Sequence, residues 1–195
     1  MFRALLVIIF ILAPTLVKAG EPIFDAATAG DTAAIESLLA GGVAVDARAP
    51  DEATPLMAAA LGGQLEAAKL LLAKGADVMA RNSGGFTALH AAAYSGSVPV
   101  AALLLDNKAV LEDAANKAGT TPLFVAAEMN HPEVVELLIA KGADVKLPEG
   151  HGYWATTRAF WKGNKKVVSL LKRHGLGCQQ DKLDANQYAQ CLEIK

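Results

Sequence analysis

The chain has 195 residues, which is enough for one domain with a substantial hydrophobic core. Hydrophobic residues make up 53% of it, and this excludes a disordered chain. The 18 basic residues are outnumbered by 20 acidic ones, so the charge balance argues against general binding to nucleic acid.

Residues 1–19 have the layout of a secretory signal peptide that is cleaved. The positively charged start Met1–Arg3 precedes the apolar run Ala4–Val17, and Val17-Lys18-Ala19 offers small residues at the two positions that a signal peptidase reads. The alternative is a retained membrane anchor, but a span needs about 20 apolar residues and this run has about 14. We therefore expect an exported chain with no stable membrane span after cleavage.

The rest of the chain repeats itself at a shift of about 33 residues. Thr54-Pro55-Leu56 returns as Thr87-Ala88-Leu89 and as Thr121-Pro122-Leu123, and Gly75–Val78 returns as Gly142–Val145. Weaker copies lie on both sides of these. The sequence therefore predicts a repeat domain over residues 20–176, followed by a tail at 177–195, with units at about 21–48, 49–81, 82–115, 116–148 and 149–176.

Each unit predicts two helices. The threonine can cap the first helix, and proline is tolerated in its first turn. A residue suited to the left-handed conformation then ends that helix, and a second helix with apolar spacing follows and ends at a glycine. The residues that end the first helices are, in order, Gly30, Gly63, Gly96, Asn130 and Gly163.

The motif T-P-L-x-x-A-A, the glycine turn and a second helix ending in L-L-x-x-G-A-D-V together resemble the ankyrin repeat. The resemblance implies an all-α solenoid of about five helix-turn-helix units with β-turn fingers, in which neighbouring units cover each other's apolar faces. It also implies that His90 is a structural hydrogen-bonding residue. Glu52 departs from the pattern, because the corresponding finger position in the later units is glycine.

No constellation of catalytic residues is found in the sequence. The four histidines do not fit a metal-binding helix signature, and the paired glycines are helix stops and turns rather than a phosphate-binding loop. The two cysteines are too few for a structural zinc site. We therefore predict no enzyme, no cofactor and no metal.

The resemblance implies that a partner binds the concave side, which is formed by the fingers and by exposed positions late in the first helices. Residues at the same repeat position line up on one face, so the large apolar side chains there should form one strip that anchors an interface. The alternative is that some of these rings pack against each other or under the tail. The predicted partner-binding residues are Leu61, Phe86, Tyr94, Glu128, Met129, Tyr153, Trp161 and Lys162.

The two cysteines, Cys178 and Cys191, lie in the tail, and an even pair in an exported chain predicts a disulfide. In one straight helix their Cα atoms would be about 20 Å apart, against the roughly 4.4–6.8 Å that a bridge allows. The tail must therefore double back on itself.

Charge is distributed unevenly along the solenoid. The stretch from His151 to Gln180 contains bases and no acid, whereas the first third is acidic. One interpretation is that these are solvated helix faces. The other is that the basic end attracts an acidic partner or an anionic wall polymer.

These features predict a non-catalytic protein-protein interaction module of the bacterial cell envelope, located in the periplasm or secreted, and monomeric on its own. An alternative is a stoichiometric inhibitor or immunity protein that blocks a periplasmic toxin or a peptidoglycan-cutting enzyme and so protects the producing cell. In both cases the expected partner is another protein rather than nucleic acid.

Overall fold

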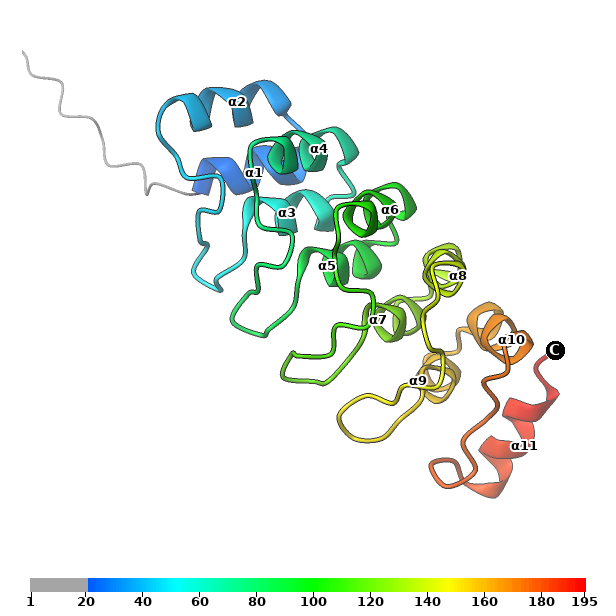
Figure 1. Ribbon diagram of the computed structural model, residues 1–195. Coiled ribbons are helices and arrows are strands. Elements are labelled where there is room, and N and C mark those ends of the chain that lie inside the picture. The colour runs from blue at the N-terminus through cyan, green and yellow to red at the C-terminus, as the bar shows by residue number, and fades with distance from the viewer. Residues whose placement is uncertain (1–20) are drawn as a thin grey trace, which may run out of the picture.

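The computed structural model describes residues 21–195, and the predicted signal peptide lies outside this range. The regular structure of the described residues is entirely helical (Figure 1). This confirms the predicted all-α solenoid. The helices are α1 (Glu21–Ala29), α2 (Thr32–Ala40), α3 (Pro55–Leu61), α4 (Leu65–Ala73), α5 (Ala88–Ser95), α6 (Val98–Asp106), α7 (Pro122–Glu128), α8 (Pro132–Ala140), α9 (Ala155–Trp161), α10 (Lys165–Arg173) and α11 (Ala185–Glu193).

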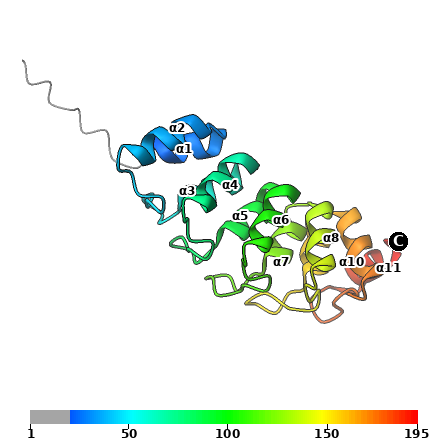
Figure 2. The same cartoon turned by 45° about the horizontal axis from the view of Figure 1, so that its top comes forward.

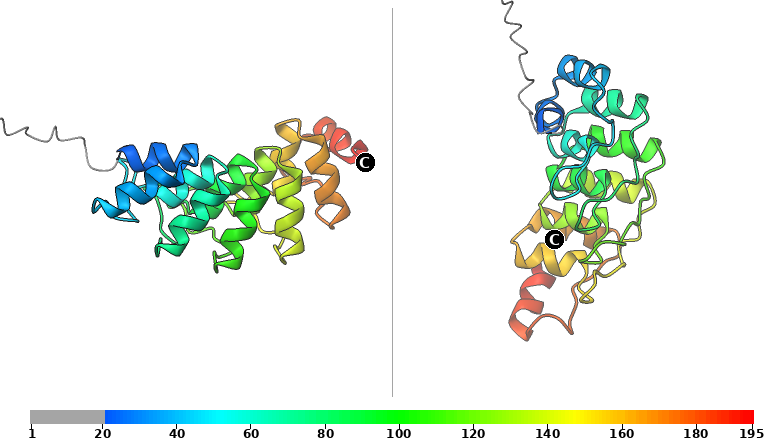
Figure 3. Two further views of the ribbon diagram at one scale, coloured as in Figure 1. Left: turned by 90° about the horizontal axis from the view of Figure 1, so that it is seen from above. Right: turned by 90° about the vertical axis from the view of Figure 1, so that its left-hand side faces the viewer.

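The first ten helices form five antiparallel pairs stacked side by side. The first helices of the pairs make an inner row, in which each contacts the next from α1 to α9, and the second helices make an outer row from α2 to α10. The pairs follow one another in chain order, each displaced from the pair before it (Figure 2), and two further views show the two rows (Figure 3). Each unit therefore buries its apolar face against its neighbours rather than around one common centre.

Small residues allow the rows to approach closely. Ala59 and Ala60 of α3 are completely buried, and so are Ala92 of α5 and Ala126 of α7. Threonines at the helix starts satisfy free backbone donors, since Thr54 accepts a hydrogen bond from the Met57 N–H at 3.3 Å. The first helices are thus both capped and packed as the repeat pattern predicts.

Each first helix ends in the left-handed conformation where the sequence predicts it. The four glycines at this position have φ between 67° and 79°, and Asn130 takes the same conformation with φ 62°. In four units a glycine with positive φ ends the second helix. In the third unit Lys108 occupies this position instead, with φ 69°. The prediction that a glycine ends every second helix is therefore wrong for that unit.

The fingers are the loops that join one unit to the next, and they lie along one side of the stack (Figure 1). Main-chain hydrogen bonds connect them in series: the Ser83 N–H donates to the Asp51 carbonyl at 2.7 Å, and the Lys117 N–H donates to the Gly84 carbonyl at 2.9 Å. Glu52 is held at φ 64°, which glycine would adopt without strain. The fingers therefore form a continuous wall beside the inner helices.

The tail doubles back and closes the C-terminal end. Cys178 and Cys191 form the predicted disulfide, with Cα atoms 6.2 Å apart, and Cys191 is completely buried. The Lys172 ammonium group of α10 donates to the main-chain carbonyls of Cys191, Leu192 and Ile194 at the end of α11. Across the described residues, no helix combines the length and the apolar character that a membrane span requires.

Candidate functional site: a groove on the inner face

A groove of about 700 Å³ runs along the inner face of the first four units. Four helices, α1, α3, α5 and α7, form its floor, and the fingers form one side. Of the lining residues within 21–195, only Asp51 and Glu128 carry a formal charge. The lining consists of Phe24, Thr28, Ala49, Asp51, Ala53, Met57, Ala58, Leu61, Asn82, Phe86, Thr87, His90, Ala91, Tyr94, Ala118, Thr120, Val125, Glu128 and Met129.

Five of the eight predicted partner-binding residues line this groove. They are Leu61, Phe86, Tyr94, Glu128 and Met129. Leu61 and Tyr94 are also the most exposed large apolar side chains in the groove, at 50% and 53%. Such residues are unfavourable in water and are typical anchors of interfaces.

The other three predicted residues lie at the fifth unit, outside the groove. The Tyr153 and Trp161 rings contact each other edge to face, with centroids 5.0 Å apart, and the Lys182 ammonium group of the tail lies 5.1 Å from the Tyr153 centroid. The Lys162 ammonium group lies 3.6 Å from the Glu128 carboxylate. The predicted strip is thus divided into an apolar groove over four units and an aromatic pair over the fifth.

An ion cluster separates these two parts. The Arg158 guanidinium donates to the Glu128 carboxylate at 3.0 Å, and Lys162 approaches the same carboxylate oxygen. Glu128 therefore faces the groove but is neutralised from the fifth unit. Of the two charged residues in the groove lining, only Asp51 forms no ion pair within residues 21–195.

Several residues of the groove floor are not among the predicted partner-binding residues. Phe24 and Met57 occupy the same repeat position as His90, and Ala58, Ala91 and Val125 follow one position later. A helix places residues three and four apart on one face, so Met57 and Ala58 lie beside Leu61. Counting back one turn from each exposed apolar residue would have identified these positions.

The polar side chains of the groove are engaged mainly within the protein. Asn82 Oδ1 accepts hydrogen bonds from the Gly84 and Phe86 N–H groups, each at 3.0 Å. The Thr28 hydroxyl donates to the Phe24 carbonyl at 2.8 Å. The groove therefore offers an occupant chiefly apolar contacts.

His90 connects the groove floor to the next finger. Its Nδ1 accepts from the Thr87 N–H at 3.2 Å, and its Nε2 donates towards the Asp113 and Thr120 carbonyls, each at 3.0 Å. Burial lowers the pKa of His90 and outweighs the attraction of the Thr120 carbonyl and the Asp113 carboxylate. Both ring nitrogens are engaged, as expected of a structural histidine.

Two carboxylates are held by neighbouring groups within the fingers. Burial opposes ionisation of Asp113, but hydrogen bonds from the Arg81 guanidinium and the Ala115 N–H bring its pKa below the ordinary value. Burial likewise opposes ionisation of Glu149, and hydrogen bonds from the His151 ring and main chain lower its pKa. These acids stabilise finger geometry.

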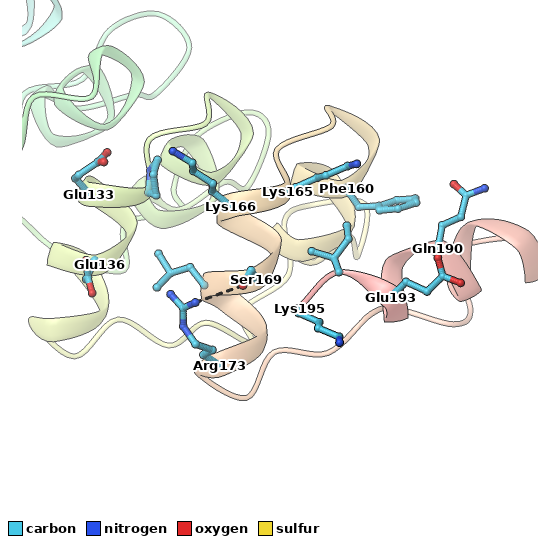
Figure 4. Close-up of a pocket in the computed structure, with 13 residues that line it drawn as sticks. Glu133, Glu136, Phe160, Lys165, Lys166, Ser169, Arg173, Gln190, Glu193 and Lys195 are labelled. Atoms are coloured by element: carbon cyan, nitrogen blue, oxygen red, sulfur yellow. Dashed lines mark hydrogen bonds between the residues drawn. The ribbon is translucent and has the colours of Figure 1, made fainter.

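A second depression, of about 920 Å³, lies on the outer side of the C-terminal end, where α8, α10 and α11 come together (Figure 4). Its charged groups are Glu133, Glu136, Lys165, Lys166, Arg173, Glu193 and Lys195. Acids from α8 and α11 thus accompany the bases of α10. The basic stretch seen in the sequence becomes a surface of mixed charge there, as solvated helix faces commonly are. Within residues 21–195, no three His, Cys, Asp or Glu side chains are grouped so that they could hold a metal ion.

Comparison with known proteins is consistent with this architecture. The family model described as ankyrin repeats (3 copies) matches residues 23–115 and 108–184. The chain belongs to the ankyrin-repeat family. Over 61 residues it is 41% identical to mouse (Mus musculus) Ankyrin repeat and SAM domain-containing protein 6 and 38% identical to the rat (Rattus norvegicus) protein of the same name. The matched part covers 31% of this ankyrin-repeat chain and only 7% of each relative.

Proposed function

We propose that this protein is a non-catalytic binding module of the cell envelope, and that it holds another protein in the groove over its first four units. Ankyrin repeats in general serve as scaffolds for protein-protein interaction, which supports the class of function. The observation that carries the proposal is the composition of the groove. It extends over four units and exposes Leu61 and Tyr94, and among residues 21–195 its one charged lining residue without an ion pair is Asp51.

The location in the envelope is supported by the sequence of residues 1–19 and by the disulfide in the tail. A disulfide persists in oxidising compartments such as the bacterial periplasm. We expect the protein in the periplasmic fraction, with a mature N-terminus at Gly20. Recovery of a chain that still begins at Met1 and sediments with membranes would instead indicate a retained anchor.

The binding function is tested by affinity capture with a matched pair of variants. Leu61→Asp places a charge in the groove, and Leu192→Asp places the same charge on α11, at a side chain that is 52% exposed compared with 50% for Leu61. A partner crosslinked in the envelope should be lost with Leu61→Asp and retained with Leu192→Asp, while both variants melt like the wild type. Equal retention by both would contradict binding in the groove.

The identity of the captured protein also distinguishes the two roles open to such a module. If this chain is an adaptor, adding the purified wild-type chain should leave any enzymatic activity of the captured protein unchanged. If the partner is a toxin or a wall-cutting hydrolase, titration to inactivity at a one-to-one ratio would instead favour the inhibitor.

A further inference from the structure

We propose that the segment held in the groove is an amphipathic α-helix with one apolar face and a basic residue placed to meet Asp51. This inference rests on the proposed function and adds the conformation and charge of the bound segment. It is carried by the hydrogen bonds that the groove residues already make and by the position of Asp51, whose carboxylate forms no ion pair within the described residues.

The groove offers little to the main chain of an extended segment. Its floor consists of helices, whose central main-chain groups are hydrogen-bonded within each helix. Carbonyls near the helix ends accept from the following turn, as Ala58 and Ala59 of α3 accept from the Gly62 and Gln64 N–H groups. Among its side chains, Thr28, Thr87, His90 and Thr120 form hydrogen bonds within the protein, and so does Asn82 through its Oδ1 atom. An occupant buried there must therefore satisfy its own N–H and C=O groups, because leaving them unpaired costs free energy.

An α-helix meets that requirement, since its hydrogen bonds are internal. It presents an apolar stripe at positions i, i+3 or i+4, and i+7, which suits a groove whose anchors repeat from one unit to the next. Leu61 of α3 and Tyr94 of α5 share one repeat position, and Met129, the residue after α7, lies one position later in its own unit. A bound strand would instead need an edge with free main-chain groups. In the fingers, main-chain hydrogen bonds already join each finger to the next, as from the Ser83 N–H to the Asp51 carbonyl.

The charge of the bound segment follows from Asp51. Its carboxylate accepts one hydrogen bond, from the Ala53 N–H at 3.1 Å, and forms no ion pair in the described part of the chain. Glu128, near the other end of the groove, is neutralised by Arg158 and Lys162. Among the residues that the structure describes, no lysine or arginine lines the groove. A basic side chain of the partner is therefore favoured at the Asp51 end of the groove.

Selection of peptides tests both statements without knowledge of the natural partner. Two display libraries of equal diversity are panned on the full chain, one on a helical scaffold and one of unconstrained peptides. Clones that also bind Leu61→Asp are discarded. We expect the surviving clones to come from the helical scaffold, with apolar residues at helical spacing and an excess of lysine and arginine over aspartate and glutamate.

The charge contact is then measured with synthetic peptides from the selected clones. Asp51→Asn keeps the acceptor for the Ala53 N–H but removes the charge, and Asp181→Asn is the control because Asp181 is an exposed acid in the tail. Binding measured by fluorescence anisotropy should weaken about threefold with Asp51→Asn, as for an exposed ion pair, and should not change with Asp181→Asn. Added salt should reduce the difference.

The outcomes separate this inference from the function on which it rests. Groove-dependent clones that are extended, rich in proline or acidic would overturn the amphipathic basic helix and leave the binding function standing. Equal affinity for wild type and Asp51→Asn would overturn the charge contact. The absence of any clone sensitive to Leu61→Asp, with Tyr94→Ala as a second groove variant, would count against the inference and the binding function alike.

Discussion

The first four units and the fifth unit share one repeat pattern but use their inner faces differently. In the third unit, His90 reaches forward and donates to carbonyls of the following finger. In the fifth unit the same repeat position is Thr157, and within residues 21–195 the tail follows this unit in place of a sixth finger. Its hydroxyl donates instead to Gln179 of the tail, at 2.8 Å. The tail thus takes the place of the missing next unit.

This difference leaves the inner face of the first four units open, whereas the tail covers part of the fifth unit and Trp161 there stays 40% exposed. In the third unit, which has neighbours on both sides, His90 forms its forward hydrogen bonds with the next finger, and Tyr94 on the same inner face stays 53% exposed. At the end, Gln179 also accepts from the Trp154 N–H and donates to the Gly152 carbonyl, while Lys182 lies over Tyr153. A repeat protein therefore needs a specific closing element, and the remaining units are free to bind.

Loss of the disulfide should have the largest effect on the closed end. Replacing Cys178 and Cys191 by serine frees the unfolded tail and should lower the free energy of unfolding by about 2–4 kcal/mol. The measurement is urea denaturation with and without reductant. A wild-type chain whose midpoint is unchanged by reductant would contradict a closed bridge.

Loss of the Gln179 side chain should be the next largest effect. Gln179→Ala removes hydrogen bonds to Trp154, Thr157 and Gly152 and leaves buried groups unpaired, so it should cost about 1–3 kcal/mol. Gln190→Ala on exposed α11 is the control and should change stability by less than about 0.5 kcal/mol. Equal effects in thermal denaturation would mean that the tail does not substitute for a sixth finger.

Acid should weaken the junction that His90 makes. Because its pKa is lowered in the folded chain, its contribution to stability is complete above the unfolded value of about 6.5 and is lost as the pH falls through the lower folded value. Protonated Nδ1 can no longer accept from the Thr87 N–H. The urea midpoint of the wild type should therefore decline as the pH falls through this window. His90→Gln should abolish this decline, whereas the control His174→Gln, at an exposed position after α10, should retain it.

Backbone strain at Glu52 should give the smallest effect, and in the opposite direction. Glu52→Gly relieves the left-handed conformation at φ 64° and should raise stability by about 0.5–1 kcal/mol. Glu136→Gly, at an exposed position in the interior of α8, is the matched control and should lower stability by about 1 kcal/mol. A loss of stability in both variants, measured by urea denaturation, would show that the Glu52 side chain is itself required.

The sequence predicts the repeated architecture well because its signals are local. Glycine or asparagine at the end of each first helix reports a required left-handed residue, and Asn130 shows that the rule is conformational rather than a matter of one residue type. The left-handed conformation of Lys108 was not predictable from this rule, because a lysine adopts it only where the surrounding structure holds it there.

The candidate site was predictable only in part, because it depends on contacts between units. Repeat positions located Leu61 and Tyr94, while the neighbouring floor residue Met57 required the helical period as well. The separation of Tyr153 from the groove depends on Lys182, which reaches it from the tail. No local pattern carries that contact.

Hydroxyl-radical footprinting of the captured complex tests the central claim most directly, because it reads side-chain exposure on both regions at once. If the groove over the first four units holds the partner, oxidation of Phe86, Tyr94 and Met129 should fall on binding, while oxidation of Tyr153 and Trp161 should remain at its level in the free chain. Protection centred on Tyr153 and Trp161, with Tyr94 still freely oxidised, would contradict the account.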